Sequence, residues 1–94
     1  MTELKKLREK IDQLDFQIHD LVNERAKIAL QIAEAKMAEE AGLSNFQRPD
    51  REAEILQKIT EHNKGPLSSV AIASIFKAIM KECLNIQEEK YLKK

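Results

Sequence analysis

The sequence predicts an all-helical fold of three helices with a very long first helix. The 94 residues include only two glycines and two prolines, and hydrophobic residues make up 43% of them. These proportions are typical of one small helical domain, which we expect to cover residues 1–94. Apolar residues also recur every three or four positions along most of the chain, which is the spacing of one helix face.

The first predicted helix extends from Thr2 to Ala41, because no proline or glycine occurs before Gly42, a residue suited to a left-handed cap. Such a helix would span about 60 Å, whereas a compact domain of this length measures roughly 30 Å across. The helix therefore overhangs its own domain. We expect a second copy to cover it in a two-fold dimer with antiparallel or crossing first helices.

Two shorter helices follow. The second is predicted to begin near Arg48, with Pro49 in the first turn, and to end before Gly65 and Pro66. Ser68 or Ser69 is expected to cap the third. Its apolar face consists of Ile72, Ile75, Phe76, Ile79, Met80, Cys83 and Ile86, and Gln87 continues the same face.

Basic residues lie on or beside the apolar side of the first helix. We define the apolar stripe as the positions at three- and four-residue spacing, and Arg25 takes one of them: Leu4, Leu7, Ile11, Leu14, Ile18, Leu21, Arg25, Ile28, Ile32 and Ala35. Arg25 and Lys36 point within roughly 20° of each other, about 16 Å apart along the axis, so both can reach one small ligand. Arg8 is roughly 25 Å from Arg25, so it would reach that ligand only from another chain.

Polar residues also occur on the apolar faces of the other helices. Glu52 precedes the apolar residues of the second helix on their own face, and Arg48 lies one turn before it. Gln87 shares a face of the third helix with Cys83. Each residue alone has an ordinary explanation, such as an interhelical ion pair, the helix dipole or a solvated last turn. Together they predict a mostly cationic pocket, because buried unpaired charges cost several kcal/mol without a compensating ligand.

Other kinds of chemistry have little support in the sequence. The 16 basic and 16 acidic residues give zero formal net charge, so we expect no nucleic acid partner. His19, His62 and the single Cys83 form no metal-ligand pattern, and we expect neither a metal nor a cofactor. No apolar run is long enough to span a membrane and the N-terminus is charged, so we expect a soluble, cytoplasmic protein.

Four segments resemble the all-helical chorismate mutase family. LREKIDQLDFQIHDLVNERAKIALQIAEAK from Leu7 to Lys36 is similar to the first helix of the family, and RPDREAEIL from Arg48 to Leu56 is similar to the start of its second helix. NKGPLS from Asn63 and IFKAIMKECLNIQ from Ile75 to Gln87 most resemble the mutase domain of bifunctional proteins that also carry a prephenate dehydratase. The resemblance covers nearly the whole chain and leaves open whether the chain is monofunctional or one domain of a longer protein.

The resemblance implies an intertwined homodimer that converts chorismate, a dicarboxylate, to prephenate by an intramolecular [3,3] rearrangement on the route to phenylalanine and tyrosine. By analogy with the family, Arg25 and Arg8 of the partner subunit would bind the two carboxylates of the substrate. By the same analogy, Lys36 and Gln87 would donate hydrogen bonds to the ether oxygen, and Glu52 would accept a hydrogen bond from the ring hydroxyl. The resemblance implies three further substrate-binding positions: Arg48, Arg51 and Cys83. Arg48 stands where some relatives carry an Asp near the ring hydroxyl, and Cys83 stands where some carry a Ser close to a carboxylate. From spacing alone, Arg51 points away from the apolar face of Glu52.

Two alternatives stay open. An isochorismate pyruvate-lyase resembles the same scaffold and would use a similar cationic pocket. A non-catalytic helical dimerisation module would instead pair Arg25 with carboxylates such as Asp15 or Glu24 across the interface. Product analysis separates the first alternative from a mutase, and tolerance of a neutral residue at position 25 identifies the second.

Overall fold

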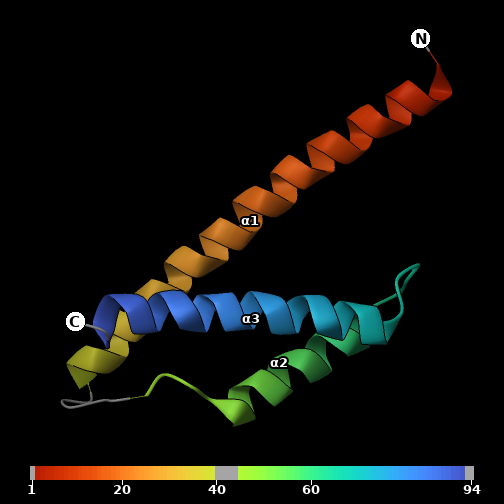
Figure 1. The fold of residues 1–94 in the computed structure, drawn as a ribbon. Helices are drawn as coiled ribbons and strands as arrows, with labels where there is room; N and C mark the ends of the chain where they lie inside the picture. The colour runs from red at the N-terminus through yellow and green to blue at the C-terminus, as the bar shows by residue number, and fades with distance from the viewer. Residues whose placement is uncertain (1, 40–44, 93–94) are drawn as a thin grey trace.

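The computed structural model describes residues 2–39 and 45–92 of the chain. They form three helices, α1 (Glu3–Glu39), α2 (Pro49–His62) and α3 (Ser69–Tyr91), and no strand occurs within these residues. Figure 1 shows α3 lying between the other two helices, with the N-terminal half of α1 extending away from both. The all-helical fold and its long first helix are as the sequence predicts.

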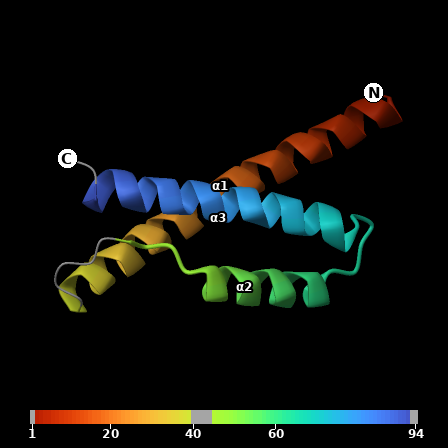
Figure 2. The same cartoon turned by 60° about the horizontal axis from the view of Figure 1, so that its bottom comes forward.

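The packing centres on α3. It contacts both α1 and α2, whereas in the described chain no α-carbons of α1 and α2 lie within 8 Å of each other. The molecule measures 59 × 27 × 17 Å, and the view in Figure 2 again shows half of α1 beyond the other helices. The predicted overhang of the first helix is therefore present.

The contact between α1 and α3 uses small residues beside the apolar stripe. Ala29 and Ala33 of α1 are buried, as are Met80 and Cys83 of α3. Alanine side chains allow two helix backbones to approach closely, which explains why this face of α1 receives α3. The large apolar residues of the stripe, by contrast, are 46–65% exposed in the single chain: Leu4, Leu7, Ile11, Leu14, Ile18, Leu21, Ile28 and Ile32. Burying them requires another surface.

Local sequence signals define the helix ends. Pro49 is the first residue of α2, and the N–H of Asn63 bonds back to the carbonyls of Ile59 and Thr60 at its end. The Ser68 hydroxyl accepts a hydrogen bond from the N–H of Ala71 at 3.1 Å, which confirms Ser68 as the cap of α3. The predicted cap at Gly42 lies outside the described residues. None of the described helices is long and apolar enough to cross a membrane.

Candidate active site

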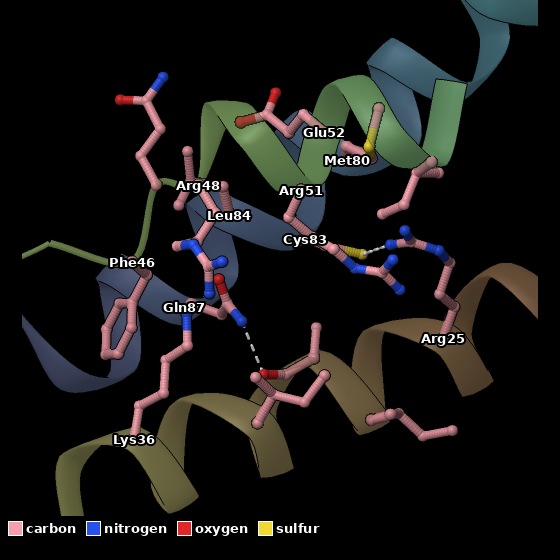
Figure 3. Close-up of a pocket in the computed structure, with 15 residues that line it drawn as sticks. Arg25, Lys36, Phe46, Arg48, Arg51, Glu52, Met80, Cys83, Leu84 and Gln87 are labelled. Carbon is pink, nitrogen blue, oxygen red and sulfur yellow. Dashed lines mark hydrogen bonds between the residues drawn. The ribbon is translucent and has the colours of Figure 1, made fainter. Parts of the chain in front are cut away.

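A cavity of about 280 Å³ lies where the packed half of α1, the start of α2 and the C-terminal half of α3 meet. Figure 3 shows polar side chains from all three helices converging on it. Its volume is close to the lower end of small-molecule pockets, about 300–1,000 Å³, so it suits a compact ligand. Apolar side chains such as Ile28, Met80 and Leu84 complete its walls.

Seven of the eight residues that the sequence singles out line this one cavity: Arg25, Lys36, Arg48, Arg51, Glu52, Cys83 and Gln87. They come from all three helices and from the residue just before α2. Arg8 is the exception, because it is exposed on the overhanging half of α1 and does not line the cavity of its own chain. Arg8 and Arg25 of one chain therefore lie too far apart to line the same cavity, as the helical spacing predicts.

The two cations of α1 that line the cavity, Arg25 and Lys36, have no carboxylate partner within residues 2–39 and 45–92. Arg25 is half-buried, and its Nη1 donates to the Sγ of Cys83 at 3.3 Å (Figure 3). This contact orients the guanidinium but supplies no carboxylate to pair with it. Lys36 is also half-buried and enters the cavity from the last turn of α1. Both positive charges are therefore available to an anionic ligand.

The two arginines at the start of α2 are paired with acids of the same helix. Nε and Nη2 of Arg48 donate to the two carboxylate oxygens of Asp50 at 3.2 and 2.9 Å. This hydrogen-bonded ion pair lowers the pKa of Asp50 to about 2. Nη1 of Arg51 donates to Glu54 at 2.7 Å. Lys58 and Arg51 together lower the pKa of Glu54, with the hydrogen bond from Lys58 as the largest cause.

The spacing argument for Arg51 was wrong. It predicts a side chain that points away from the face of Glu52, whereas the structure places Arg51 along the cavity (Figure 3). The reason is the length of the side chain, because an arginine can bend from a neighbouring face of the helix over its rim. Helical spacing fixes the direction of the Cα–Cβ bond and not the position of a guanidinium several bonds away.

Gln87 is held by the backbone of α1. Its Nε2 donates to the carbonyl oxygen of Ala29 at 2.7 Å, so the amide is fixed between α3 and α1 (Figure 3). An amide nitrogen carries two N–H groups, and this contact uses one of them. The site therefore contains an oriented neutral donor beside the cationic Lys36 and Arg25.

Phe46 is a cavity residue that the sequence analysis did not identify. It precedes α2 in the segment 45–48 and is only 5% exposed. The available signal was an isolated aromatic residue between the polar Asn45 and Gln47. No group of three His, Cys, Asp or Glu side chains that could hold a metal ion occurs among the described residues.

The cavity lies within the segment that matches a known family. The family model described as chorismate mutase type II matches residues 7–88. The chain belongs to the chorismate mutase family. Curated relatives of this chorismate mutase domain are bifunctional chorismate mutase/prephenate dehydratases, 44% identical over 92% of the chain in Stutzerimonas stutzeri and 40% identical over 95% in Aquifex aeolicus. The chain spans about a quarter of the length of these relatives, 24% and 25% respectively.

Solved chorismate mutases share the fold. A form II structure from Thermus thermophilus is 31% identical, with a TM-score of 0.85 over 93% of this chain and 96% of that one. The Helicobacter pylori chorismate mutase, crystallised in complex with prephenate, is 34% identical, with a TM-score of 0.81 over 96% of this chain and 97% of that one. The family assignment from sequence resemblance is thereby confirmed.

Proposed function

We propose that this chain catalyses the rearrangement of chorismate to prephenate in a cavity that is completed by a second copy of the chain. The observation that carries the proposal is the uncompensated charge of the site. Arg25 and Lys36 have no carboxylate partner in the described chain, whereas Arg48 and Arg51 are paired with Asp50 and Glu54. The unpaired positive charges of Arg25 and Lys36 therefore favour the binding of an anionic substrate.

The charge balance matches a dicarboxylate. Arg8 of the partner subunit would add a third cation to Arg25 and Lys36, and Glu52 supplies one carboxylate that makes no ion pair with the described residues. Three cations and one carboxylate leave an excess of two positive charges. Chorismate carries two carboxylates, so its binding would neutralise the site.

The reaction is intramolecular, so the protein has to supply orientation and electrostatic stabilisation. Arg25 and Arg8 of the partner subunit would hold the two carboxylates and thereby favour the compact conformer that reacts. Lys36 and Gln87 would donate to the ether oxygen, where negative charge develops as the C–O bond breaks. Because this charge is larger in the transition state than in the substrate, these two donors would accelerate the reaction rather than only bind the substrate. Glu52 would accept a hydrogen bond from the ring hydroxyl.

The exposed stripe of α1 supports an antiparallel, intertwined homodimer. In one two-fold arrangement Leu4 lies opposite Ile28, Ile11 opposite Leu21, and Leu14 opposite Ile18, so large apolar residues meet along most of the overlap. In the same register Leu7 of the partner subunit lies opposite Arg25. Its neighbour, Arg8 of the partner subunit, then reaches the cavity that Arg25 lines.

A cytoplasmic location completes the proposal. Cys83 is a free thiol and is buried beside Arg25 in the cavity. A reducing compartment such as the cytoplasm keeps such a thiol in the form that can accept the hydrogen bond from Arg25.

The test is the loss of chorismate with identification of the product, comparing the parent with Lys36→Ala. We expect prephenate from the parent and a loss of kcat/KM of about a hundredfold or more in the variant, the usual cost of removing a donor to developing negative charge. Lys27→Ala is the matched control, because Lys27 is exposed on the same helix and does not line the cavity. Folding is checked by circular dichroism.

Two results would contradict the proposal. A folded parent that leaves chorismate unchanged would rule out the mutase reaction, and pyruvate release from isochorismate would then identify a lyase. Equal activity of the Lys36→Ala and Lys27→Ala variants would remove Lys36 from the reaction.

A further inference from the structure

The two sides of the cavity belong to helices whose backbones do not approach each other closely. Arg25 and Lys36 lie on α1, whereas Arg48, Arg51 and Glu52 lie at the start of α2. No α-carbons of the described parts of α1 and α2 lie within 8 Å of each other. The distance across the cavity is therefore set indirectly, by α3 and by the segment 45–48 that leads into α2.

Phe46 anchors that segment. Among the described residues it is the one buried hydrophobic side chain outside the helices, at 5% exposed. Its ring lies edge-on to the ring of Tyr91, with 6.3 Å between centroids and an interplanar angle of 71°. This is the favoured geometry for two aromatic rings. Lys90 Nζ lies 5.6 Å from the centroid of the Tyr91 ring, so the ring also contacts a cation.

Tyr91 continues the face of α3 that forms the floor of the cavity. Cys83, Gln87 and Tyr91 follow one another at intervals of four residues, which places them on one side of the helix. Cys83 and Gln87 contact α1 through Arg25 and the carbonyl of Ala29. Tyr91 contacts the entry to α2 through Phe46. One face of α3 therefore contacts both sides of the cavity, α1 on one side and the segment that leads into α2 on the other.

We propose that Phe46 and Tyr91 form a clasp that sets the position of the α2 wall, and that Phe46 is a positioning residue for Arg48 and Glu52. The inference rests on the proposed function, because its kinetic consequence concerns the same substrate. Arg48 follows Phe46 by two residues, so any shift of the ring moves the rim of the cavity. The clasp keeps this rim in place before the ligand arrives.

Loss of the clasp affects binding more than the chemical step. Without the ring contact, the segment 45–48 and the side chains at the start of α2 must be ordered by the substrate, and this cost weakens binding. Lys36 and Gln87 remain on α1 and α3, and Gln87 keeps its bond to the Ala29 carbonyl. We therefore expect Phe46→Ala to raise KM about tenfold, the cost of ordering one or two side chains, with kcat lowered less than threefold.

The chain contains a built-in reporter for the clasp that does not depend on activity. Cys83 is the single cysteine and is 6% exposed inside the cavity. The rate at which it reacts with a thiol reagent such as Ellman's reagent measures how often the cavity opens. We expect a several-fold faster reaction in Phe46→Ala, because loosening the rim gives the reagent access.

Three further variants and one control separate the clasp from general destabilisation. Tyr91→Ala is also expected to raise KM and to speed the thiol reaction. The double variant Phe46→Ala, Tyr91→Ala is expected to have the same KM as Phe46→Ala alone, because the two substitutions remove the same ring contact. Tyr91→Phe keeps the ring and is expected to have the same KM as the parent. Phe16→Ala is the matched control, since Phe16 is 65% exposed and faces away from the apolar stripe. It should leave KM and the thiol reaction unchanged.

Several results would overturn the inference. One is a folded Phe46→Ala variant with parent KM and parent thiol reactivity. Another is a lower kcat at unchanged KM, which indicates only fewer folded molecules. If Phe46→Ala loses its helical circular dichroism, Phe46→Leu, which keeps apolar volume without the ring edge, is measured with the same two outcomes. A parent without mutase activity would contradict the proposed function, while the thiol reaction would still test the clasp.

Discussion

The two halves of α1 differ in what surrounds them. Residues 22–39 include the buried Ala29 and Ala33 and the half-buried Arg25 and Lys36, and they pack against α3. Every residue from 2 to 21 is exposed, although the apolar stripe runs through this half with the same spacing (Figure 1). In the packed half α3 therefore covers the alanines beside the stripe, whereas the first half has no cover within the chain, and the large apolar residues of the stripe are exposed in both halves.

The proposed dimer would account for this difference and for the position of Arg8 together. A helix that exposes so much apolar surface gains little stability from its own residues, since most helical stability in proteins comes from packing. The uncovered half also carries Arg8, the one predicted site residue outside the cavity. A second copy would bury the stripe and supply Arg8 in a single step.

The largest expected effect comes from placing charge at the middle of the uncovered stripe. In the antiparallel register Leu14 and Ile18 face their partner copies, so Leu14→Glu combined with Ile18→Glu puts four carboxylates at the centre of the dimer. Burying unpaired charges costs several kcal/mol. We expect monomers and loss of nearly all mutase activity, measured by light scattering after size-exclusion chromatography and by chorismate turnover.

Phe16→Glu is the matched control for this variant. Phe16 lies between the two substituted positions but on the opposite side of α1, and it is 65% exposed. It should remain a dimer with activity close to the parent. A Leu14→Glu, Ile18→Glu variant that stays dimeric would show that the stripe is not the interface.

A smaller effect is expected when chains with different defects are mixed. Arg8→Ala and Arg25→Ala should each lose about a hundredfold or more in kcat/KM, because each removes a charged contact to a carboxylate. After subunit exchange, half of the dimers are mixed, and each mixed dimer has one site with both arginines. The expected recovery is about a quarter of the parent activity, as two-fold symmetry requires. If exchange is confirmed by mass spectrometry and no activity returns, Arg8 does not act across the interface.

The helices themselves follow from local signals in the sequence. Pro49 and Ser68 predict the starts of α2 and α3, and the absence of helix breakers before Gly42 predicts the long α1. Helical spacing also places Arg25 and Lys36 on one side of the first helix, and both line the cavity. These predictions hold because capping and periodicity depend on backbone geometry, which neighbouring residues determine.

Tertiary contacts of the site were harder to predict. The apolar stripe indicates one buried face of α1, yet α3 packs on the adjoining alanines and leaves the stripe exposed. Periodicity cannot separate two adjacent faces that serve different partners. The contact between Arg25 and Cys83 and the one between Phe46 and Tyr91 join residues far apart in the chain. Such pairs depend on how the helices cross, which spacing within one helix does not specify.

The smallest expected effect concerns an ion pair that belongs to one chain alone. Arg48 lowers the pKa of Asp50 from its ordinary value of 3.8 to about 2. A carboxylate with a lowered pKa in the folded state contributes stability above its unfolded pKa and loses it as the pH falls toward the folded pKa. Asp50→Asn should therefore melt slightly below the parent at pH 7, by a few degrees at most, because both partners are exposed. The difference should vanish as the pH falls from about 4 to 2.

Asp12→Asn is the control, because it removes the same charge from the uncovered half of α1, where Asp12 makes no ion pair with the described residues. Melting curves of the three proteins at pH 7 and pH 2 make the comparison. An Asp50→Asn deficit that persists unchanged at pH 2 would mean that the side chain stabilises α2 through its shape or hydrogen bonds and not through its charge. A deficit confined to neutral pH assigns it to the charge of Asp50, which is stabilised by Arg48 first and then by the backbone N–H of Arg51, both in the same chain.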